Sequence, residues 1–310
     1  MEAIDAKIIA LLGLFVIAII CGLIPLFLAE CAPTYRGAGM ERLFGFLNCF
    51  AGGVILATAM LHLLPEVRRE FLFSSDYVKI DPDFPAAEFL ACAGIFLMLV
   101  IEQGILACKE RLTKTATEDI PLTTTEYGYY TDASIHASQD DDEIRTLHEE
   151  ELEYIQSVLR SYMFFIALCL HGIFEGIVLG LLSDPHSVLI LFAAIACHEG
   201  PVSFSFAVNI RRSWLRKSAG VVLVCLHAAV FPLGIGIGIA ITESASSTLT
   251  MSFVSGLMQG VAVGLLVYLT FFEILPYELK ENENRMLKTL CVLIGFTVIT
   301  LLQFIPAVHP

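Results

Sequence analysis

The stretch "LCLHGIFEGIVLGLL", residues 168–182, is apolar apart from His171 and Glu175. It ends a longer apolar run, 158–182, which has about the 20 residues that one helix needs to cross a bilayer. A charged group at mid-bilayer costs on the order of 3 kcal/mol and usually faces a cavity or a partner. We therefore expect a membrane helix that carries a functional site.

Seven more apolar runs of similar length accompany this one. Hydrophobic residues make up 56% of the 310, charged residues 16%, and the mean hydropathy of +0.76 excludes an ordinary soluble domain. The sequence predicts an all-α integral membrane protein with eight transmembrane helices in a single membrane domain, 1–310, with no separate soluble domain. The expected spans are 6–30, 42–66, 86–109, 158–182, 187–210, 217–241, 250–275 and 287–308.

Lysine and arginine residues indicate the orientation of the spans. An even number of spans puts both termini on one side, and with the N-terminus outside, 14 of the 18 Lys and Arg residues fall on the inner side. Cytoplasmic loops carry such an excess, so we predict non-cytoplasmic termini, although Arg68 and Arg69 count against this. The first run follows "MEAIDAK", which lacks a basic n-region, and we interpret it as a retained span.

The longest interruption, 110–157, follows the third span. It holds 13 acidic residues against Arg111, Lys114 and Arg145, a net charge of −10. We predict a long, disordered, acidic cytoplasmic loop. His136 and His148 could gather divalent cations weakly there, but a solvated loop without a specific ligand is the favoured interpretation.

The second and seventh spans resemble each other around a proline. In "GVILATAMLHLLPE" (53–66) and "GLLVYLTFFEILPYE" (264–278), a glycine lies twelve residues before the proline of a Leu-Pro pair, and His62 aligns with Glu273. The two spans run in opposite directions, so His62 and Glu66 fall near the outer mouth and Glu273 near the inner one. This favours inverted repeats in a 3+2+3 order, as in many secondary transporters. Chance similarity between two apolar helices is the alternative.

Histidines and carboxylates in the spans have the spacing of metal ligands. A separation of four residues turns about 400° around a helix, so His171 and Glu175 share one face, and His62 and Glu66 repeat that spacing. His198, in the next span, should lie level with His171. Two imidazoles with one or two carboxylates suit zinc, and nearly as well ferrous iron or manganese.

The alternative for each histidine is a core residue that bonds to a carbonyl or hydroxyl group. We favour that interpretation for His227 alone. It is harder to sustain for His171, Glu175 and His198, because three such residues would have to meet at one depth.

At "HGIFEG" (171–176) and "CHEGPVSFS" (197–205) the chain resembles the Zrt/Irt-like (ZIP) family of divalent-metal transporters, over all eight spans. Within the family it is most similar to the branch that includes the animal plasma-membrane zinc importers. The resemblance implies that His171 and Glu175 are metal ligands, and that His198 with Glu199 occupies the metal positions of the fifth span.

The resemblance also assigns the mouths of the pathway. It ties His62 and Glu66 to the outer entrance and transport site, and Glu273 with Pro276 to the inner exit. Phe272 stands where many members of the family have histidine.

Three departures from the family pattern concern a second metal ion. Gly172 replaces a frequent asparagine, Val202 stands where many members have a bridging glutamate, and Phe231 replaces a sixth-span glutamate. A binuclear centre would thus have lost most of its second ligand set. We expect one ion per site, with Glu199 as an extra ligand or a titrating group.

The leading hypothesis is uptake of Zn²⁺ into the cytosol by alternating access, with Fe²⁺, Mn²⁺ or Cd²⁺ as alternative cargo. The expected partners are the divalent ion and the lipid bilayer, with no nucleic acid and no catalytic cofactor; a homodimer stays open. The rival hypothesis is an intramembrane zinc hydrolase with Glu199 as general base. It lacks the H-E-x-x-H motif, because "GPV" follows His198-Glu199. A metal sensor without net flux is a third candidate.

Overall fold

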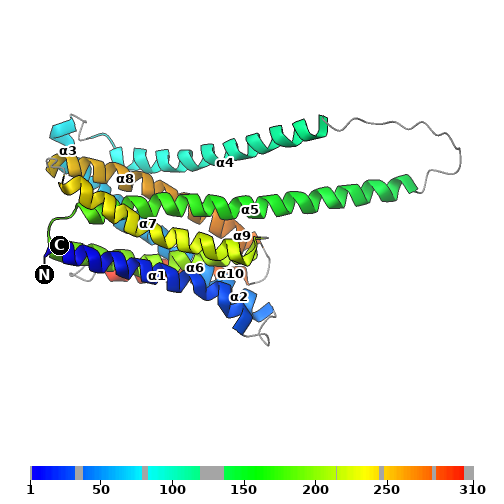
Figure 1. Ribbon diagram of the computed structural model, residues 1–310, viewed down its shortest axis with the longest axis horizontal. Helices are drawn as coiled ribbons and strands as arrows, with labels where there is room; N and C mark the ends of the chain where they lie inside the picture. The colour runs from blue at the N-terminus through cyan, green and yellow to red at the C-terminus, as the bar shows by residue number, and fades with distance from the viewer. Residues whose placement is uncertain are drawn as a thin grey trace.

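The computed structural model describes residues 2–31, 38–78, 83–118, 136–213, 215–243, 248–280 and 284–303 (Figure 1). Every regular element in these ranges is a helix, and the segments written η are π-helical. The elements are α1 (Ala3–Cys31), α2 (Ala38–Ala57), η2 (Thr58–Leu63), α3 (Leu64–Val78), α4 (Ala86–Glu118), α5 (His136–Leu181), α6 (Pro185–Arg212), α7 (Lys217–Glu243), α8 (Thr248–Tyr268), η3 (Leu269–Ile274), α9 (Leu275–Lys280) and α10 (Arg285–Gln303).

Eight stretches of the described residues are long and apolar enough to span a membrane, as the sequence predicts. The second and seventh, Gly39–Ser74 and Ser252–Lys280, are longer than expected. Each combines an α-helix, a π-helical segment and a second α-helix without a break in the helical rod. The apolar pattern stops near the proline of each rod, whereas the helix continues beyond it.

Helices also enter the predicted loop 110–157 from both sides. Helix α4 runs to Glu118 and α5 begins at His136. Residues 119–135 and the side chains of 109–156 lie outside the described residues. Disorder in this segment therefore stays a prediction, as does any metal binding by His136 and His148.

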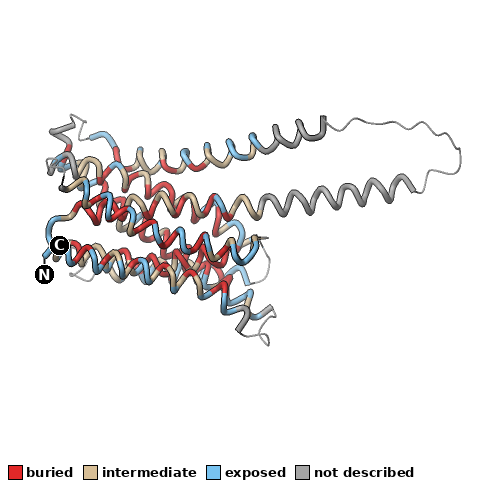
Figure 2. The backbone as a smooth tube through the Cα atoms, viewed as in Figure 1, coloured by how far each residue is buried: buried red, intermediate tan, exposed pale blue. Residues whose placement is uncertain are grey.

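The helices pack as two bundles. One contains α1, α5, α6 and α7, and the other contains the rods α2–η2–α3 and α8–η3–α9 with α4 and α10. Buried residues concentrate where the helices meet, while α4 is largely exposed or half-buried (Figure 2). Contacts between the bundles run mainly from α5 to α8 and from α2 to α6. Hydrophobic side chains on the outer surface are expected of a protein in lipid.

The packing pairs agree with the 3+2+3 inverted order. Helix α1 packs on α6 as α7 packs on α5, and α2 packs on α10 as α8 packs on α4. These pairs interchange when the first three spans are exchanged with the last three and the fourth with the fifth. The π-helical segments follow the same rule, since η2 begins seven residues before Pro65 and η3 seven before Pro276. π-Segments are frequent at functional sites.

Close helix approach at glycines sets the distance between α5 and α7. A Cβ atom added to Gly238 would lie 2.4 Å from the carbonyl oxygen of Ile177 and 2.7 Å from the Cα of Gly180. Gly176 and Gly234 meet in the same way one turn along. Small residues at such positions let membrane helices pack backbone to backbone.

We predict that Gly238→Ala destabilises the folded protein by about 1–3 kcal/mol, because the added methyl group overpacks the α5–α7 contact. Gly236→Ala is the matched control on the same helix, since nothing lies within 4 Å of a Cβ atom there. The measurement is the midpoint of thermal unfolding in detergent. Equal midpoints for the two variants would contradict the close-packing argument.

Candidate metal centre

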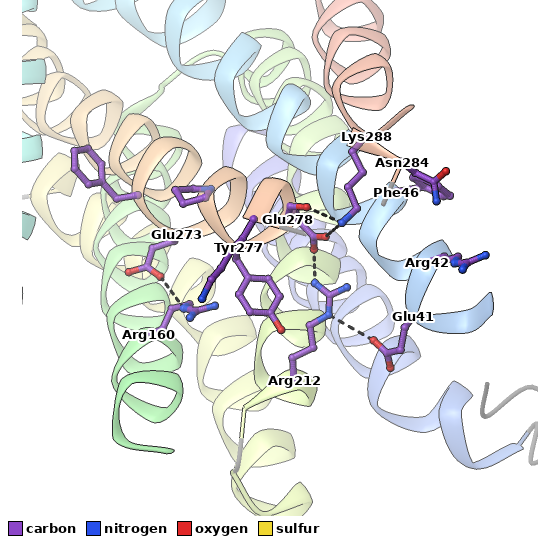
Figure 3. Close-up of a pocket in the computed structure, with 13 residues that line it drawn as sticks. Glu41, Arg42, Phe46, Arg160, Arg212, Glu273, Tyr277, Glu278, Asn284 and Lys288 are labelled. Carbon is purple, nitrogen blue, oxygen red and sulfur yellow. Dashed lines mark hydrogen bonds and ion pairs between the residues drawn. The ribbon is translucent and has the colours of Figure 1, made fainter. Parts of the chain in front are cut away.

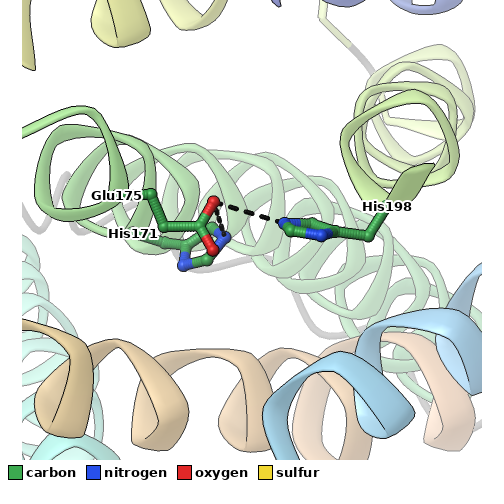
Figure 4. A group of neighbouring side chains, drawn as sticks. All are labelled: His171, Glu175 and His198. Atoms are coloured by element: carbon green, nitrogen blue, oxygen red, sulfur yellow. Dashed lines mark hydrogen bonds and ion pairs between the residues drawn. The ribbon is translucent and has the colours of Figure 1, made fainter. Parts of the chain in front are cut away.

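Three of the side chains singled out in the sequence meet inside the protein. Nitrogen and oxygen atoms of His171 and Glu175 on α5 and His198 on α6 all lie within 4.8 Å of one another (Figure 4). In the described part of the chain, this is the group of three that could hold a metal ion. The residues are 1%, 4% and 2% exposed, so the group is enclosed by protein.

Local structure brings the two helices into this register. Residues 182–184 join α5 to α6, so the two helices run in opposite directions. Asp184 caps α6, accepting a 2.7 Å hydrogen bond from the backbone N–H of Ser187, and Pro185 is the first residue of the helix. The bond from Ser187 also holds the pKa of Asp184 below its usual range. The tight connection places His198 beside Glu175.

Hydrogen bonding fixes which nitrogen of His198 faces the carboxylate. Nδ1 lies 3.0 Å from the carbonyl oxygen of Ala194, and a carbonyl can only accept, so Nδ1 carries the hydrogen. Nε2 lies 3.2 Å from Oε2 of Glu175. In the neutral ring Nε2 holds a lone pair, which would face a negative oxygen. The arrangement is favourable only with positive charge between or on these groups.

His171 has the same need. Its Nε2 lies 3.5 Å from Oε2 of Glu175, at the far limit of a hydrogen bond. Within the described residues neither ring nitrogen of this buried side chain has a hydrogen-bond partner. A buried polar group without a partner costs about 1–3 kcal/mol. A cation bound by His171, Glu175 and His198 would satisfy all three.

Glu199 lies next to this group but makes separate contacts. Its Oε1 accepts a hydrogen bond of 2.5 Å from Ser203 and lies 3.0 Å from Nε2 of His227 on α7. The sequence singled out Glu199, whereas His227 was interpreted as a core residue on its own. The structure brings the two together, both almost fully buried. The four-residue spacing of Glu199 and Ser203 was visible in the sequence, but the approach of α7 was not.

The positions that lack second-metal ligands are filled by apolar side chains. A Cβ atom at Gly172 would lie 3.2–3.4 Å from side-chain atoms of Val230 and Phe231, so the phenylalanine ring takes the space of a side chain at 172. Val202 and Phe231 are themselves buried. The chemistry of these residues fits one ion at the centre.

A cavity of about 490 Å³, here called the Glu66 cavity, lies beside the centre. Its walls include His62 and Glu66, which the sequence predicts at the outer mouth of the pathway. Val178 and Ala194 also line it. Val178 is three residues from Glu175, and Ala194 is four residues from His198. The Glu66 cavity thus reaches within one helical turn of the centre on both α5 and α6.

A second cavity, of about 1020 Å³, has Glu273 in its wall and is called the Glu273 cavity (Figure 3). It lies toward the end of α6 and the start of α10, and its walls include Arg160, Arg212 and Lys288. The Glu66 cavity lies at the opposite end of the helices, since its walls include the connection between α5 and α6.

Ion pairs that the sequence did not predict join the bundles at the Glu273 cavity. Glu278 is 2% exposed, forms an ion pair with Arg212 and accepts a hydrogen bond of 2.8 Å from Asn48. Nζ of Lys288 lies 3.6 Å from the Glu278 carboxylate. Glu278 is the last residue of the "EILPYE" motif, so the sequence drew attention to it. Its partners could not be predicted, because they lie on three other helices.

Buried apolar side chains separate the centre from the Glu273 cavity. Phe164 on α5 and Phe206 on α6 stack with ring centroids 5.8 Å apart, and Leu168 belongs to the same core cluster. Along α5 and α6 these residues lie between the centre and the Glu273 cavity, whereas the Glu66 cavity comes within one helical turn of the centre.

The chain is similar to zinc transporters along nearly its whole length. The model of the family described as "ZIP Zinc transporter" matches residues 4–303. Zinc transporter ZIP1 of Danio rerio is 31% identical over 301 residues, 97% of this chain and 98% of that protein. ZIP1 of Homo sapiens is 33% identical over 305 residues, covering 97% and 91%. Zinc transporter ZIP3 of Bos taurus is 31% identical over 315 residues, covering 97% and 98%.

A family match of this extent agrees with the eight spans and with the His/Glu centre in their interior. The chain belongs to the ZIP family of zinc transporters.

Proposed function

We propose that this protein imports Zn²⁺ into the cytosol by binding it between His171, Glu175 and His198. The observation that carries the proposal is the lone pair of His198 Nε2, which faces a buried carboxylate oxygen 3.2 Å away. A divalent cation between the two atoms turns a repulsive contact into two coordinate bonds. Two imidazoles and a carboxylate are common zinc ligands.

Zinc is favoured over other cargo by ligand chemistry and by the relatives. Imidazole with carboxylate also accepts Fe²⁺, Mn²⁺ and Cd²⁺, but the Irving–Williams order puts zinc above iron and manganese. The relatives reported above are all described as zinc transporters. Family membership also makes the protein a transporter and not the hydrolase considered from the sequence.

The two cavities supply the route. The ion enters through the Glu66 cavity past Glu66 and His62. It then moves to the centre, which lies within one helical turn of the cavity wall, and leaves toward Glu273. Glu199, held by Ser203 and His227, serves as an additional ligand or as a proton acceptor beside the centre.

Alternating access follows from the division into two bundles. All three ligands of the centre belong to the bundle α1, α5, α6 and α7, whereas Glu66 and Glu273 belong to the other. A rigid-body movement of one bundle past the other carries the ion across the apolar barrier at Phe164 and Phe206. The ion pairs of Glu278 and Glu273 with the first bundle break during that movement.

The Lys and Arg distribution orients the transporter, with both termini outside and the Glu273 cavity facing the cytosol. With the plasma membrane as its location, the Glu66 cavity opens to the extracellular side and transport is uptake. The acidic segment 110–157 is then cytoplasmic. A homodimer is compatible with this arrangement.

Replacement of the ligands tests the function. We expect His171→Ala, Glu175→Gln and His198→Ala to lower saturable ⁶⁵Zn uptake at least roughly tenfold in cells with equal surface expression, because each removes a metal ligand. His186→Ala, which removes an exposed histidine from the same helix as His198, should leave uptake unchanged. If the ligand variants transport as the control does, the proposal fails. Uptake of iron or manganese with none of zinc would replace the cargo.

Acidification should slow uptake. Metal ligands bind the ion in their deprotonated form, and an imidazole has an ordinary pKa of about 6.5, so protons compete with zinc as pH falls below 7. The measurement is initial ⁶⁵Zn uptake between pH 7.5 and 5.5 at constant free zinc. A rate that rises on acidification would contradict simple competition and favour proton-coupled transport.

Antibody labelling tests the orientation. An epitope tag at the N-terminus should be stained on intact cells, since the terminus is predicted to be outside. A second tag, inserted between residues 126 and 127 in the acidic segment, should be stained only after permeabilisation. The reverse pattern would invert the direction of transport proposed above.

A further inference from the structure

Glu273 is a buried carboxylate whose charge is weakly compensated. Its side chain is 6% exposed, and Nε of Arg160 lies 3.9 Å from its Oε2. The hydroxyl of Tyr268 lies 3.5 Å from Oε1 of Glu273 but 2.9 Å from Oε2 of Glu102. A hydroxyl has one hydrogen, so Tyr268 donates mainly to Glu102. Arg160 is then the principal compensation for Glu273.

The surroundings hold the Arg160 guanidinium in this position. It lies 4.4 Å from the centroid of the Tyr277 ring, and the guanidinium of Arg212 lies over the same ring at 5.2 Å. Tyr277 lies between the two arginines in Figure 3, with Arg160 directed toward Glu273. Contacts of this kind are attractive, because the face of an aromatic ring carries partial negative charge. Arg160 belongs to α5 and its partners to η3 and α9, so the contacts join the two bundles.

Arg160 also lies on the side of α5 that carries the metal centre. It precedes His171 by eleven residues, which is about 20° more than three full turns and roughly 16 Å along the helix. An ion that leaves the centre along this face of α5 reaches the Glu273 cavity beside Arg160.

We propose that Arg160 is a tethered cation that prevents Glu273 from holding the transported ion tightly, and so sets the affinity of the exit. The inference rests on the proposed role of Glu273 as exit. Two carboxylates, Glu102 and Glu273, meet at Tyr268, and without a nearby positive charge they would attract a divalent cation strongly. A pathway conducts when its sites bind an ion weakly enough to release it. Guanidinium suits this purpose because it stays charged at every physiological pH.

Equilibrium binding to the purified full-length chain tests this inference without requiring transport. The His171→Ala background removes the centre, and ⁶⁵Zn binding is measured by dialysis in detergent. Adding Arg160→Gln should create zinc binding at least roughly tenfold tighter than the background. Adding Glu273→Gln as a third change should abolish the gain.

Two control variants separate this role from a structural ion pair. Lys280→Gln removes a positive charge from the same cavity, but no ion pair of Lys280 with Glu273 is found among the described residues, so it should not create the site. Arg160→Lys keeps the charge and should behave as the background does. Arg160→Met, whose chain still packs on Tyr277, replaces the glutamine variant if that protein does not fold.

Transport kinetics give a second readout. In the otherwise unchanged chain, Arg160→Gln should lower the maximal rate and the half-saturating zinc concentration together, because slow release retains the ion at the exit. A loss of rate with unchanged half-saturation, or no gain of binding in the dialysis, would overturn the inference. Because the dialysis does not depend on flux, it can support or refute the role of Arg160 even if zinc import itself is disproved.

Discussion

A carboxylate enclosed among membrane helices must find positive charge, and in the described part of the chain the groups paired with Glu175 are the imidazoles of His171 and His198. His198 offers Nε2 because its Nδ1 is bound to the carbonyl of Ala194, and His171 offers a ring with no other partner among the described residues. Burial makes the charge costly, since Glu175, His171 and His198 are each at most 4% exposed. Helix packing therefore creates a need that a divalent cation satisfies.

The proposed transport mechanism depends on the division of the helices into two bundles. In the proposed mechanism the groups that hold the ion and the groups at the mouths belong to different bundles, so relative movement would change which mouth the ion faces. The same division explains the ion pairs of Glu278 and Glu273. A buried charge pair gains little over apolar packing but costs several kcal/mol when one partner is removed. Such contacts define one closed arrangement at the Glu273 cavity without making it permanently stable.

Much of the centre could be predicted because it depends on local geometry. The four-residue spacing of His171 and Glu175 and the short connection to α6 suffice to bring His198 alongside, and the eight apolar runs give the spans. His227 and Glu278 could not be placed in this way, because their partners depend on how helices far apart in sequence rotate and pack. The π-helical segments were also missed, although the shared Leu-Pro register marked both positions. Apolar periodicity also does not tell where a helix ends beyond the membrane, which is why α4 and α5 extend into the acidic segment.

The carboxylates of Glu175 and Glu199 differ in the groups that compensate their negative charge. Glu199 has a donor built into the fold at one oxygen, since Ser203 donates a 2.5 Å hydrogen bond to Oε1, whereas Oε2 has no hydrogen-bond partner among the described residues. Glu175 has ring nitrogens that act as donors only when protonated, and as ligands otherwise. The ring of Phe231 packs into the space beside Gly172, so that space is not open to a second ion. One oxygen of Glu199 is thus bonded by the protein whatever the cargo, whereas Glu175 depends on the imidazoles of the candidate centre or on a cation between them. This difference is the basis for proposing Glu175 as a ligand of the transported ion.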